Sequence, residues 1–385
     1  MWSSFVILLR RNLSTAVTAV TAVTSPSESS IIKLFLSDLH NERNLDTLIR
    51  NFKTASHSHR FRAKHGIYER TVRRLASADR FQSIHEILQY QKQFNDFSKE
   101  GFSARIITLY GKSGMFDNAH KLFDEIPQRT VLSLNALFSA YLHSKKFDMV
   151  LSLFNELPSK LSIEPNLVSY NTVIKAFCEI GSFDSAISML QEMESKGVEP
   201  DLITFNTLLV ELYAKGRFED GEKIWNQMEG KSVTPDVKSY NAKLVGMVVV
   251  KKTNDAVGLY EKIKNEGVKP NLFSFNALIK GFVNEGDLDE AKKWYSEIAS
   301  TDFDPNVETF ATLLPFLCEK DDLNAAFQVS KDIFNTRCRF GPRGSLLQQV
   351  VDVLVSNSMI SEAEEIVKLG KASSHFRYKL NLPEG

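Results

Sequence analysis

One motif is written four times in this chain, as Leu167-Val-Ser-Tyr-Asn-Thr-Val-Ile, Leu202-Ile-Thr-Phe-Asn-Thr-Leu-Leu, Val237-Lys-Ser-Tyr-Asn-Ala-Lys-Leu and Leu272-Phe-Ser-Phe-Asn-Ala-Leu-Ile. The prolines that close the units recur at a constant spacing of 35 residues, at Pro165, Pro200, Pro235, Pro270 and Pro305. A fixed period of about 20 to 50 residues is typical of a solenoid, in which each unit buries its apolar face against its neighbours. The repeated motif therefore predicts an array of small, similar units.

The apolar residues of one unit predict two short helices. The first stripe has the helical spacing i, i+3, i+4 and i+7 and comprises Tyr170, Val173, Ile174 and Phe177. A second stripe comprises Phe183, Ala186, Ile187, Leu190 and Met193. Gly181 separates the two stripes, and Gly197 with Pro200 ends the second, as expected just beyond a helix. No strand pattern appears in the repeats, so we expect an all-α fold, a right-handed superhelical solenoid of helix-turn-helix repeats.

Composition excludes several classes of protein. The 385 residues are 43% hydrophobic and 24% charged, which is ordinary for a soluble protein. Lys and Arg number 47, and so do Asp and Glu, so the total charge does not point to nucleic acid or membrane binding. Cys178, Cys318 and Cys338 form no Cys-x-x-Cys pair, which argues against a disulfide framework and a zinc site. We expect no cofactor and no metal.

The amino terminus has a different composition. Residues 1–24 contain Arg10 and Arg11, many Ser and Thr, and no acidic residue. This profile indicates an organelle transit peptide, and we assign residues 1–29 to the transit peptide and a linker. A secretory signal is the alternative, although a pair of arginines follows its apolar run where cleavage would be expected. We expect import into the mitochondrion, with the chloroplast as second choice.

The rest of the chain divides by how well it keeps the repeat. Residues 30–130 are expected to form degenerate hairpins, residues 131–306 five well-formed repeats, and residues 307–378 degenerate capping repeats before a tail at 379–385. Residues 56–64 are polar and basic and are expected to be a solvated linker. His57 and His59 within it are two residues apart, but no third ligand accompanies them as a metal site would require.

The motifs that identify the repeat are Tyr170-Asn-Thr with Pro200-Asp and Phe205-Asn-Thr with Pro235-Asp. They resemble the pentatricopeptide repeat, whose unit has 35 residues, an aromatic-Asn-Thr opening and a Pro-Asp or Pro-Asn ending. The tetratricopeptide repeat is the nearest alternative, but its period is 34 and its Trp and Leu-Gly pattern is absent here. The nearly uniform length resembles the pure class of the family. Neither the deaminase-like domain of the editing class nor a nuclease-like domain follows residue 306, so the resemblance implies a non-catalytic RNA-binding protein.

In this family each repeat reads one RNA base through its fifth and last residues. Carried over, the predicted pairs are Asn135 with Asn166, Asn171 with Asp201, Asn206 with Asp236, Asn241 with Asn271, and Asn276 with Asn306. By the family rule an Asn-Asp pair favours uracil and an Asn-Asn pair favours cytosine, so the resemblance implies the pyrimidine-rich strand C-U-U-C-C. The second residues of the repeats are expected to stack on bases, at Leu132, Val168, Ile203 and Phe273, whereas Lys238 departs from this pattern.

A purely structural interpretation competes with base reading. Each asparagine lies near a helix start, where it can satisfy local backbone groups, and the neighbouring hydroxyls look like ordinary N-caps, namely Ser133, Ser169, Thr204, Ser239 and Ser274. This interpretation accounts less well for five asparagines at one place, because alanine is the better helix former.

Charge bears on the choice of partner. Many members of the family carry a phosphate-binding lysine near the end of the first helix, and the corresponding residues here are His143, Glu179, Ala214, Val249 and Asn284. The phosphate contribution to RNA affinity is therefore expected to be weak. The chain is similar to short members of the pure class that are subunits of the plant mitochondrial ribosome. That resemblance implies a component of the mitochondrial ribosome small subunit, with rRNA and neighbouring ribosomal proteins as partners, and the weak phosphate contribution favours this setting. The alternatives are a free factor that binds an organelle mRNA and a protein-binding scaffold; neither a membrane nor a small-molecule substrate is expected.

Overall fold

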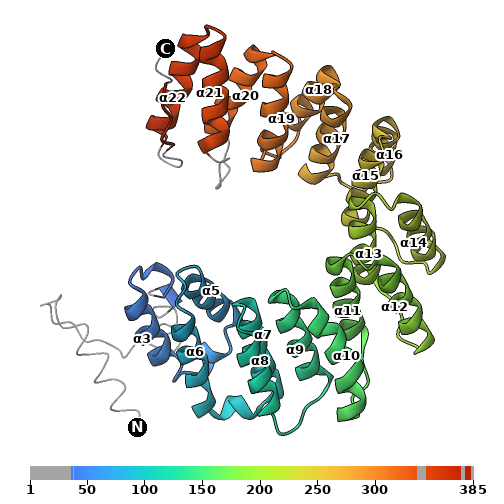
Figure 1. Ribbon diagram of the computed structural model, residues 1–385. Helices are drawn as coiled ribbons and strands as arrows, with labels where there is room; N and C mark the ends of the chain where they lie inside the picture. The colour runs from blue at the N-terminus through green and yellow to red at the C-terminus, as the bar shows by residue number, and fades with distance from the viewer. Residues whose placement is uncertain (1–35, 38, 336–343, 374–377, 383–385) are drawn as a thin grey trace, which may run out of the picture. The chain divides into compact units, whose positions relative to one another are not determined.

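The computed structural model describes residues 36–37, 39–335, 344–373 and 378–382, so the predicted transit peptide lies outside the described residues. All regular elements in these ranges are helices, and no strand occurs among them (Figure 1). The all-α prediction is confirmed. The chain forms two compact units, residues 1–146 and 147–385.

The described part of the first unit contains, from residue 45 onward, seven α-helices and two 3-10 helices. They are α3 (Leu45–Ala55), α4 (His59–Arg62), α5 (His65–Ala76), α6 (Phe81–Gln89), η1 (Tyr90–Gln93), η2 (Asn95–Ser98), α7 (Glu100–Lys112), α8 (Phe116–Asp124) and α9 (Val131–His143). Helix α7 packs against α8 and α9.

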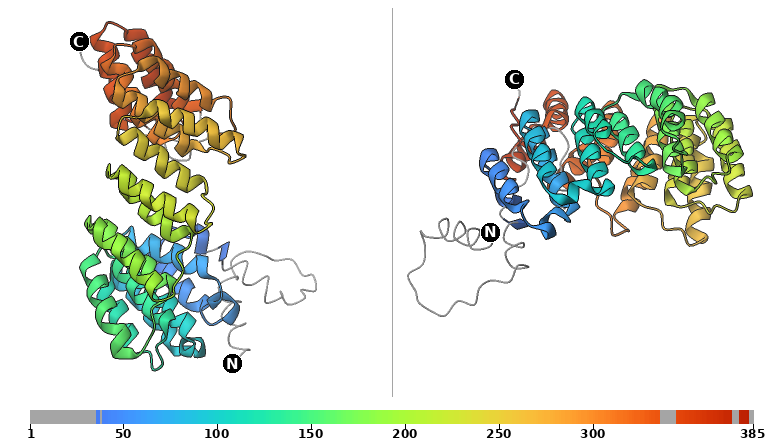
Figure 2. Two further views of the ribbon diagram at one scale, coloured as in Figure 1. Left: turned by 90° about the vertical axis from the view of Figure 1, so that its right-hand side faces the viewer. Right: turned by 90° about the horizontal axis from the view of Figure 1, so that it is seen from below.

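The second unit continues the pairs of helices, seen from two further directions in Figure 2. They are α10 (Phe147–Leu161), α11 (Leu167–Ile180), α12 (Phe183–Ser195), α13 (Leu202–Ala214), α14 (Phe218–Gly230), α15 (Val237–Val249), α16 (Thr253–Asn265), α17 (Leu272–Glu285), α18 (Leu288–Ile298), α19 (Val307–Glu319), α20 (Leu323–Asn335), α21 (Gly344–Ser356) and α22 (Ile360–Ala372). The odd-numbered helices from α11 to α19 are the first helices of successive repeats. Each packs against its own second helix and against the next first helix.

The turn between the two helices of a hairpin has one backbone signature. The fifteenth residue of each hairpin has a positive φ, at Asp79, Gly114, Lys145, Gly181, Gly216, Lys251, Gly286, Asp321 and Ser358. This left-handed conformation ends a helix by turning the chain out of its axis, and glycine adopts it without a steric penalty. The recurrence extends the repeat into hairpins whose sequence motif is weak, since Asp79 and Ser358 lie outside the strongest repeats.

Apolar stripes of neighbouring first helices form the core of the second unit. Leu208, Leu209 and Leu212 on α13 are completely buried, as the helical spacing predicts. Tyr213 is also completely buried, and its ring fits against two glycines. A Cβ added at Gly221 or Gly246 would overlap this ring. These glycines therefore allow the close approach of α13 to α14 and α15.

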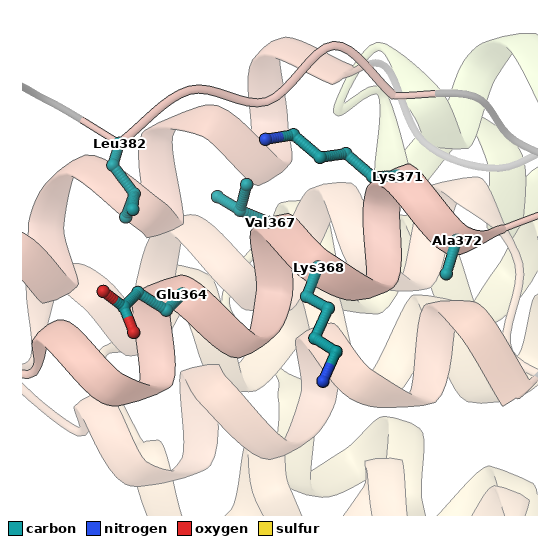
Figure 3. A pocket seen from close by; sticks show the side chains of 6 residues that line it. All are labelled: Glu364, Val367, Lys368, Lys371, Ala372 and Leu382. Atoms are coloured by element: carbon teal, nitrogen blue, oxygen red, sulfur yellow. The ribbon is translucent and has the colours of Figure 1, made fainter.

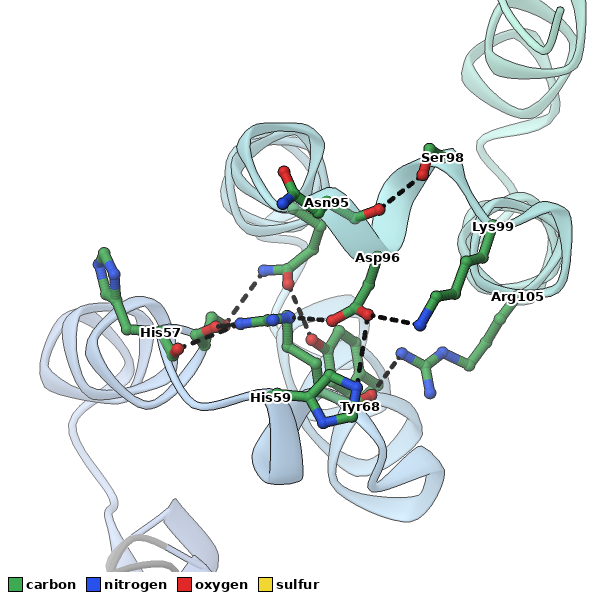
Figure 4. Close-up of polar contacts among 11 residues, drawn as sticks. His57, His59, Tyr68, Asn95, Asp96, Ser98, Lys99 and Arg105 are labelled. Carbon is green, nitrogen blue, oxygen red and sulfur yellow. Dashed lines mark hydrogen bonds and ion pairs between the residues drawn. The ribbon is translucent and has the colours of Figure 1, made fainter.

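The prediction of a solvated linker at residues 56–64 is wrong. Residues 59–62 form α4, Phe61 is completely buried, and Arg62 donates through Nε to Asp96 at 2.7 Å and through Nη1 to the Ser56 carbonyl at 2.7 Å (Figure 4). His59 and Lys99 also lie within ion-pair distance of Asp96. Burial would raise the pKa of Asp96, but the hydrogen bonds from Arg62 and Lys99 outweigh it and lower that pKa. Arg62 and Ser56 of this segment thus form part of a polar core, whereas Arg60 and Lys64 are exposed, and a count of polar residues cannot make this distinction.

The glycines of α15 and α16 provide a matched test of this packing. Replacing Gly246 by alanine should lower the free energy of unfolding by about 1–3 kcal/mol, because the new Cβ would overlap the Tyr213 ring. Replacing Gly258 by alanine should raise it by roughly 0.5–1 kcal/mol, because this helical glycine has no neighbour near its Cβ position. Urea unfolding of both variants checks the prediction. Shifts of the same sign in both midpoints would contradict the close packing at Gly246.

Candidate RNA interface

The last residue of each repeat caps the first helix of the next repeat. The N-caps of α11, α13, α15, α17 and α19 are Asn166, Asp201, Asp236, Asn271 and Asn306. Each side-chain oxygen accepts one or two backbone N–H groups of the first turn, and each N-cap N–H donates to a hydroxyl three residues later. Such capping boxes satisfy donors that the helix itself leaves unpaired. One predicted member of every base-reading pair therefore holds a helix start in place.

The prediction that the neighbouring hydroxyl residues are N-caps is wrong. Ser169, Thr204, Ser239 and Ser274 are the third residues of their helices and are completely buried. Ser133 is likewise the third residue of α9, whose N-cap is Thr130. The N-cap lies three residues earlier. The hydroxyls of Thr204, Ser239 and Ser274 face inward, toward an asparagine of the preceding first helix.

The asparagine of each repeat contacts both the cap and this hydroxyl. Asn206 donates through Nδ2 to Oδ1 of Asp236 at 3.0 Å, and its Oδ1 accepts from the Ser239 hydroxyl at 2.6 Å. The same three-residue cluster occurs in Asn171 with Asp201 and Thr204, in Asn241 with Asn271 and Ser274, and in Asn276 with Asn306 and Thr309. We call each of these an asparagine triad. Four of the predicted pairs are thus brought into direct contact.

The fifth predicted pair is divided between the two compact units. Asn135 lies on α9 in the first unit, and Asn166 caps α11 in the second. The triads of the second unit are therefore the part of the predicted interface whose geometry the structure describes.

Chemistry determines the orientation of the amides in a triad. The Asp236 carboxylate accepts only, so Asn206 must turn its NH2 group toward it. In the Asn-Asn pair, Oδ1 of Asn271 accepts from the Phe273 N–H, so Asn241 must donate to that oxygen through Nδ2. The cap residue therefore uses Oδ1 to accept from the helix and the neighbouring asparagine. Its second terminal atom takes no part in the cap, and this atom is Oδ2 in Asp and Nδ2 in Asn.

The remaining atom differs between the two kinds of pair in a way that suits different bases. Among the described residues, Oδ2 of Asp201 and Asp236 has no hydrogen-bond donor, and Nδ2 of Asn271 and Asn306 has no acceptor. Oδ2 can accept from the N3–H of uracil, whereas Nδ2 can donate to the unprotonated N3 of cytosine. The arrangement is therefore chemically suited to distinguish the two pyrimidines.

The predicted stacking residues are apolar side chains that face solvent. Leu132 is 50% exposed, Val168 53%, Ile203 64% and Phe273 63%. Single exposed apolar residues are ordinary, but these recur at the second place of four of the five well-formed repeats, Lys238 being the exception. They offer flat or branched apolar surface beside the triads, which single-strand binders use to stack bases.

Two carboxylates that the sequence did not single out alter the interface at its ends. Glu308 accepts from Nδ2 of Asn276 at 3.3 Å, so a base at this triad must compete with a negative charge. In the first unit, Glu100 accepts from the N–H groups of Thr130 at 2.8 Å and Ser133 at 3.2 Å. The fifth residue of this repeat is Ala104 rather than asparagine, and Glu100 makes the contact to the start of the next first helix instead. Only the side-by-side packing of first helices reveals these contacts between residues about 30 positions apart.

Other kinds of site find little support in the described ranges. A hollow of about 530 Å³ lies on α22 and is lined by Glu364, Val367, Lys368, Lys371, Ala372 and Leu382. Figure 3 shows that the amines of Lys368 and Lys371 point in different directions, so its polar groups do not converge. The described residues contain no cluster of three metal-ligand side chains and no helix long and apolar enough to cross a bilayer. Burial raises the pKa of the Cys178 thiol to about 12, which keeps it protonated at neutral pH.

The paired helices and the repeated capped first helices define a helical-repeat protein of the solenoid class. Family profiles identify the repeat. The PPR repeat family matches residues 129–179, 165–213 and 270–319, the pentatricopeptide repeat domain matches residues 223–285, and the PPR repeat matches residues 105–131 and 203–233. Together these matches run without a gap from residue 105 to residue 319, which is more than half of the 385 residues. The chain belongs to the pentatricopeptide repeat family.

Several relatives come from Arabidopsis thaliana. The small ribosomal subunit protein mS78 (rPPR3a) is 53% identical over 188 residues, which cover 48% of this chain and 46% of the relative. The small ribosomal subunit protein mS79 (rPPR3b) is 48% identical over 199 residues, 51% of this chain and 50% of the relative. A pentatricopeptide repeat-containing protein named as mitochondrial is 39% identical over 135 residues, 34% and 32% of the two chains. The chain matches about half the length of the two ribosomal relatives, and the mitochondrial name agrees with the location expected from the amino terminus.

The triad of Asp236 predicts a pH dependence of stability. Burial would raise the pKa of Asp236, but hydrogen bonds from the Ser239 N–H and hydroxyl, the Asn206 amide and the Lys238 N–H outweigh it and lower that pKa. Because the folded-state pKa is depressed below the unfolded value of about 3.9, the stabilisation is present above that value and is lost as the pH falls through the folded pKa.

The variant Asp236→Asn isolates this contribution. Asparagine caps a helix about as well as aspartate does, so the variant should fold. We expect the urea midpoint of the wild type to be higher than that of the variant, and this difference to be larger at pH 7 than at pH 3. Asp302→Asn, at an exposed loop residue, is the control for removing one carboxylate. A wild-type advantage at Asp236 that stays constant or grows as the pH falls would contradict the depressed pKa.

Proposed function

We propose that the chain is a non-catalytic, RNA-binding component of the small subunit of the mitochondrial ribosome and supports translation there. The observation that carries the proposal is the 53% and 48% identity to two small ribosomal subunit proteins, over about half of each chain. Identity at this level, spread over several repeats, favours a shared setting as well as a shared fold.

The asparagine triads support the RNA half of the proposal. Four triads place one unused polar atom of a cap residue beside the amide of an asparagine, on the first-helix side of each repeat. Exposed apolar residues two places after the caps can stack the bases that these atoms recognise. Recognition of this kind needs binding only, with no bond made or broken, so the protein acts without catalysis.

A free factor that stabilises, processes or activates an organelle transcript is the second candidate. It is favoured by the spacing of the triads, since four successive repeats present them in the order Asp, Asp, Asn, Asn at the caps. A protein on a ribosomal surface has less need of an uninterrupted reading row. A protein-binding scaffold, which would use the same surface without reading bases, is a third outcome of the experiments below.

Sedimentation distinguishes the first two candidates. Mitochondrial extract containing the epitope-tagged full chain is resolved on a sucrose gradient at low and high salt. We expect the chain to co-migrate with small ribosomal subunits in both conditions, because an integral subunit is held by extensive contacts that salt screens poorly. Migration of all the tagged chain near the top of the gradient at low salt would overturn the ribosomal assignment.

Base preference tests whether the successive asparagine triads read RNA bases. The wild type should prefer a strand containing C-U-U-C-C over one containing five cytosines, with weak affinity near the micromolar range. The double variant Asp201→Asn and Asp236→Asn should shift the preference from uracil to cytosine at the two adjacent uracil positions, by roughly 5- to 150-fold in total, since each of the two hydrogen bonds is worth about 0.5–1.5 kcal/mol net.

Fluorescence anisotropy with the two labelled strands measures this change. The double variant Asp302→Asn and Asp304→Asn removes the same charge from an exposed loop and serves as the matched control. Unchanged base preference in the cap variant, with a normal circular dichroism spectrum, would leave the triads with a structural role alone.

A further inference from the structure

The neutral total charge hides two oppositely charged units. Residues 39–146 contain 18 Lys and Arg against 10 Asp and Glu, a formal net charge of +8. Residues 147–385 contain 26 Lys and Arg against 35 Asp and Glu, a formal net charge of −9. The asparagine triads all lie in the acidic unit, where the field opposes a polyanion. Any strong electrostatic attraction for RNA must therefore come from the first unit.

Many cations of the first unit are already used within it. Arg62 and Lys99 contact Asp96, and Arg105 stacks on the rings of Tyr68 and Phe102. Further ion pairs join Lys53 to Glu86, Arg80 to Asp46, Lys92 to Glu125 and Arg129 to Asp124. Arg74 donates to the carbonyl groups of Leu39 and Glu42, which precede α3. These contacts stabilise the unit and offset much of the charge of the cations that make them.

A smaller group of cations remains on the surface of α5 and its neighbours. Arg70 and Arg73 are exposed on the side of α5 opposite its buried stripe of Ile67, Val72 and Leu75. Arg43 is also exposed. It directly follows Glu42, whose backbone carbonyl accepts a hydrogen bond from Arg74 of α5. Arg70 donates to the ring of His40, and no ion pair with a carboxylate is formed by Arg43, Arg70 or Arg73 among the described residues.

Helix α7 adds a fourth cation, which forms an ion pair with an acidic residue of α5. Lys112 is exposed at the end of α7 and lies 2.6 Å from Glu69 of α5. Glu69 is one helical turn before Arg73, so two cations share this single carboxylate. Arg43, Arg70, Arg73 and Lys112, which we call the basic face, thus keep a net charge of +2 after Glu69 and Glu42, which directly precedes Arg43, are counted.

We propose that the basic face binds the phosphate backbone of RNA without reading its sequence, and that it supplies most of the electrostatic affinity of this chain. The inference rests on the proposed function, because it takes RNA as the partner. Charge alone would also suit an acidic protein. RNA is favoured because Arg73 occupies the ninth place and Lys112 the thirteenth place of their repeats, on the first-helix side that carries the asparagine triads in the second unit.

The composition of the face also suits phosphate. Three of its four cations are arginines, whose planar guanidinium groups present paired N–H donors to phosphate oxygens. Each phosphate that a cation neutralises releases counterions, so binding weakens as salt increases. For single strands, each such contact contributes about −0.7 to the slope of log K against log salt. The basic face therefore predicts a measurable salt dependence that the acidic second unit cannot provide.

The test compares the full chain with two charge-matched variants. In the face variant, Arg43, Arg70, Arg73 and Lys112 are each changed to Gln. In the control variant, Lys196, Lys262, Lys264 and Lys269 are changed to Gln; these exposed lysines lie on second helices or the loops after them. Binding of a labelled, unstructured single-stranded RNA is measured by anisotropy at several salt concentrations, and thermal unfolding confirms that both variants fold.

We expect the face variant to reduce the magnitude of the salt slope by about 2.8 and the control variant to leave it nearly unchanged. Between 50 and 200 mM salt, the wild-type affinity should then fall by about 50-fold more than that of the face variant. A further variant, Glu69→Gln, should bind more tightly than the wild type, because it removes the carboxylate that pairs with Lys112 of the face. This gain cannot arise from misfolding.

Equal slopes in the wild type and the face variant would overturn the proposal, as would equal losses in the two charge-matched variants. Absence of RNA binding by the wild type at low salt would also overturn it and would assign the face to an acidic protein. The base-reading proposal fails separately: RNA binding that depends on the basic face but shows no pyrimidine preference would support this inference and contradict that one.

Discussion

The hydrogen bonds at the start of each first helix connect one repeat to the next. A helix start leaves several backbone N–H groups without intrahelical partners, and here the last residue of the preceding repeat satisfies them. The buried hydroxyl at the third helical place then extends the contact to an asparagine of that preceding repeat. The chain of contacts runs from asparagine to hydroxyl to cap, so the spacing of successive first helices depends on it.

This arrangement removes the conflict between a structural and a recognition role for the asparagines. Alanine in place of Asn206 would remove the 2.6 Å acceptor of the Ser239 hydroxyl and the amide donor of Asp236, and would leave both groups only their contacts within the capping box. The structural interpretation thus accounts for the presence of asparagine. It does not account for the presence of Asp at some caps and Asn at others, because both residues cap helices about equally well. That difference appears only in the atom left over for a partner.

Sequence reasoning was accurate where a property is local and wrong where it depends on packing across repeats. The helical spacing of Leu208, Leu209 and Leu212 predicted their burial, and Gly181 correctly marked the end of α11. The assignment of Ser239 as a cap was wrong because the true cap lies three residues earlier and the hydroxyl faces the preceding repeat. The contact of Glu308 with Asn276 joins residues 32 positions apart, which no local pattern shows. Total charge also misled, since averaging over the chain cancelled two units of opposite sign.

Recognition by a side chain that is already held has an energetic advantage. An asparagine in a triad has lost its rotamer freedom on folding, so a base that binds it does not oppose that entropy again. The same holding limits affinity, because each triad offers few unused polar atoms and the surrounding unit is negatively charged. Under the proposed base reading, such a protein would discriminate between bases better than it attracts RNA. It therefore needs a second source of binding energy, which a basic surface elsewhere on the chain or the many contacts of a ribosomal subunit can each provide.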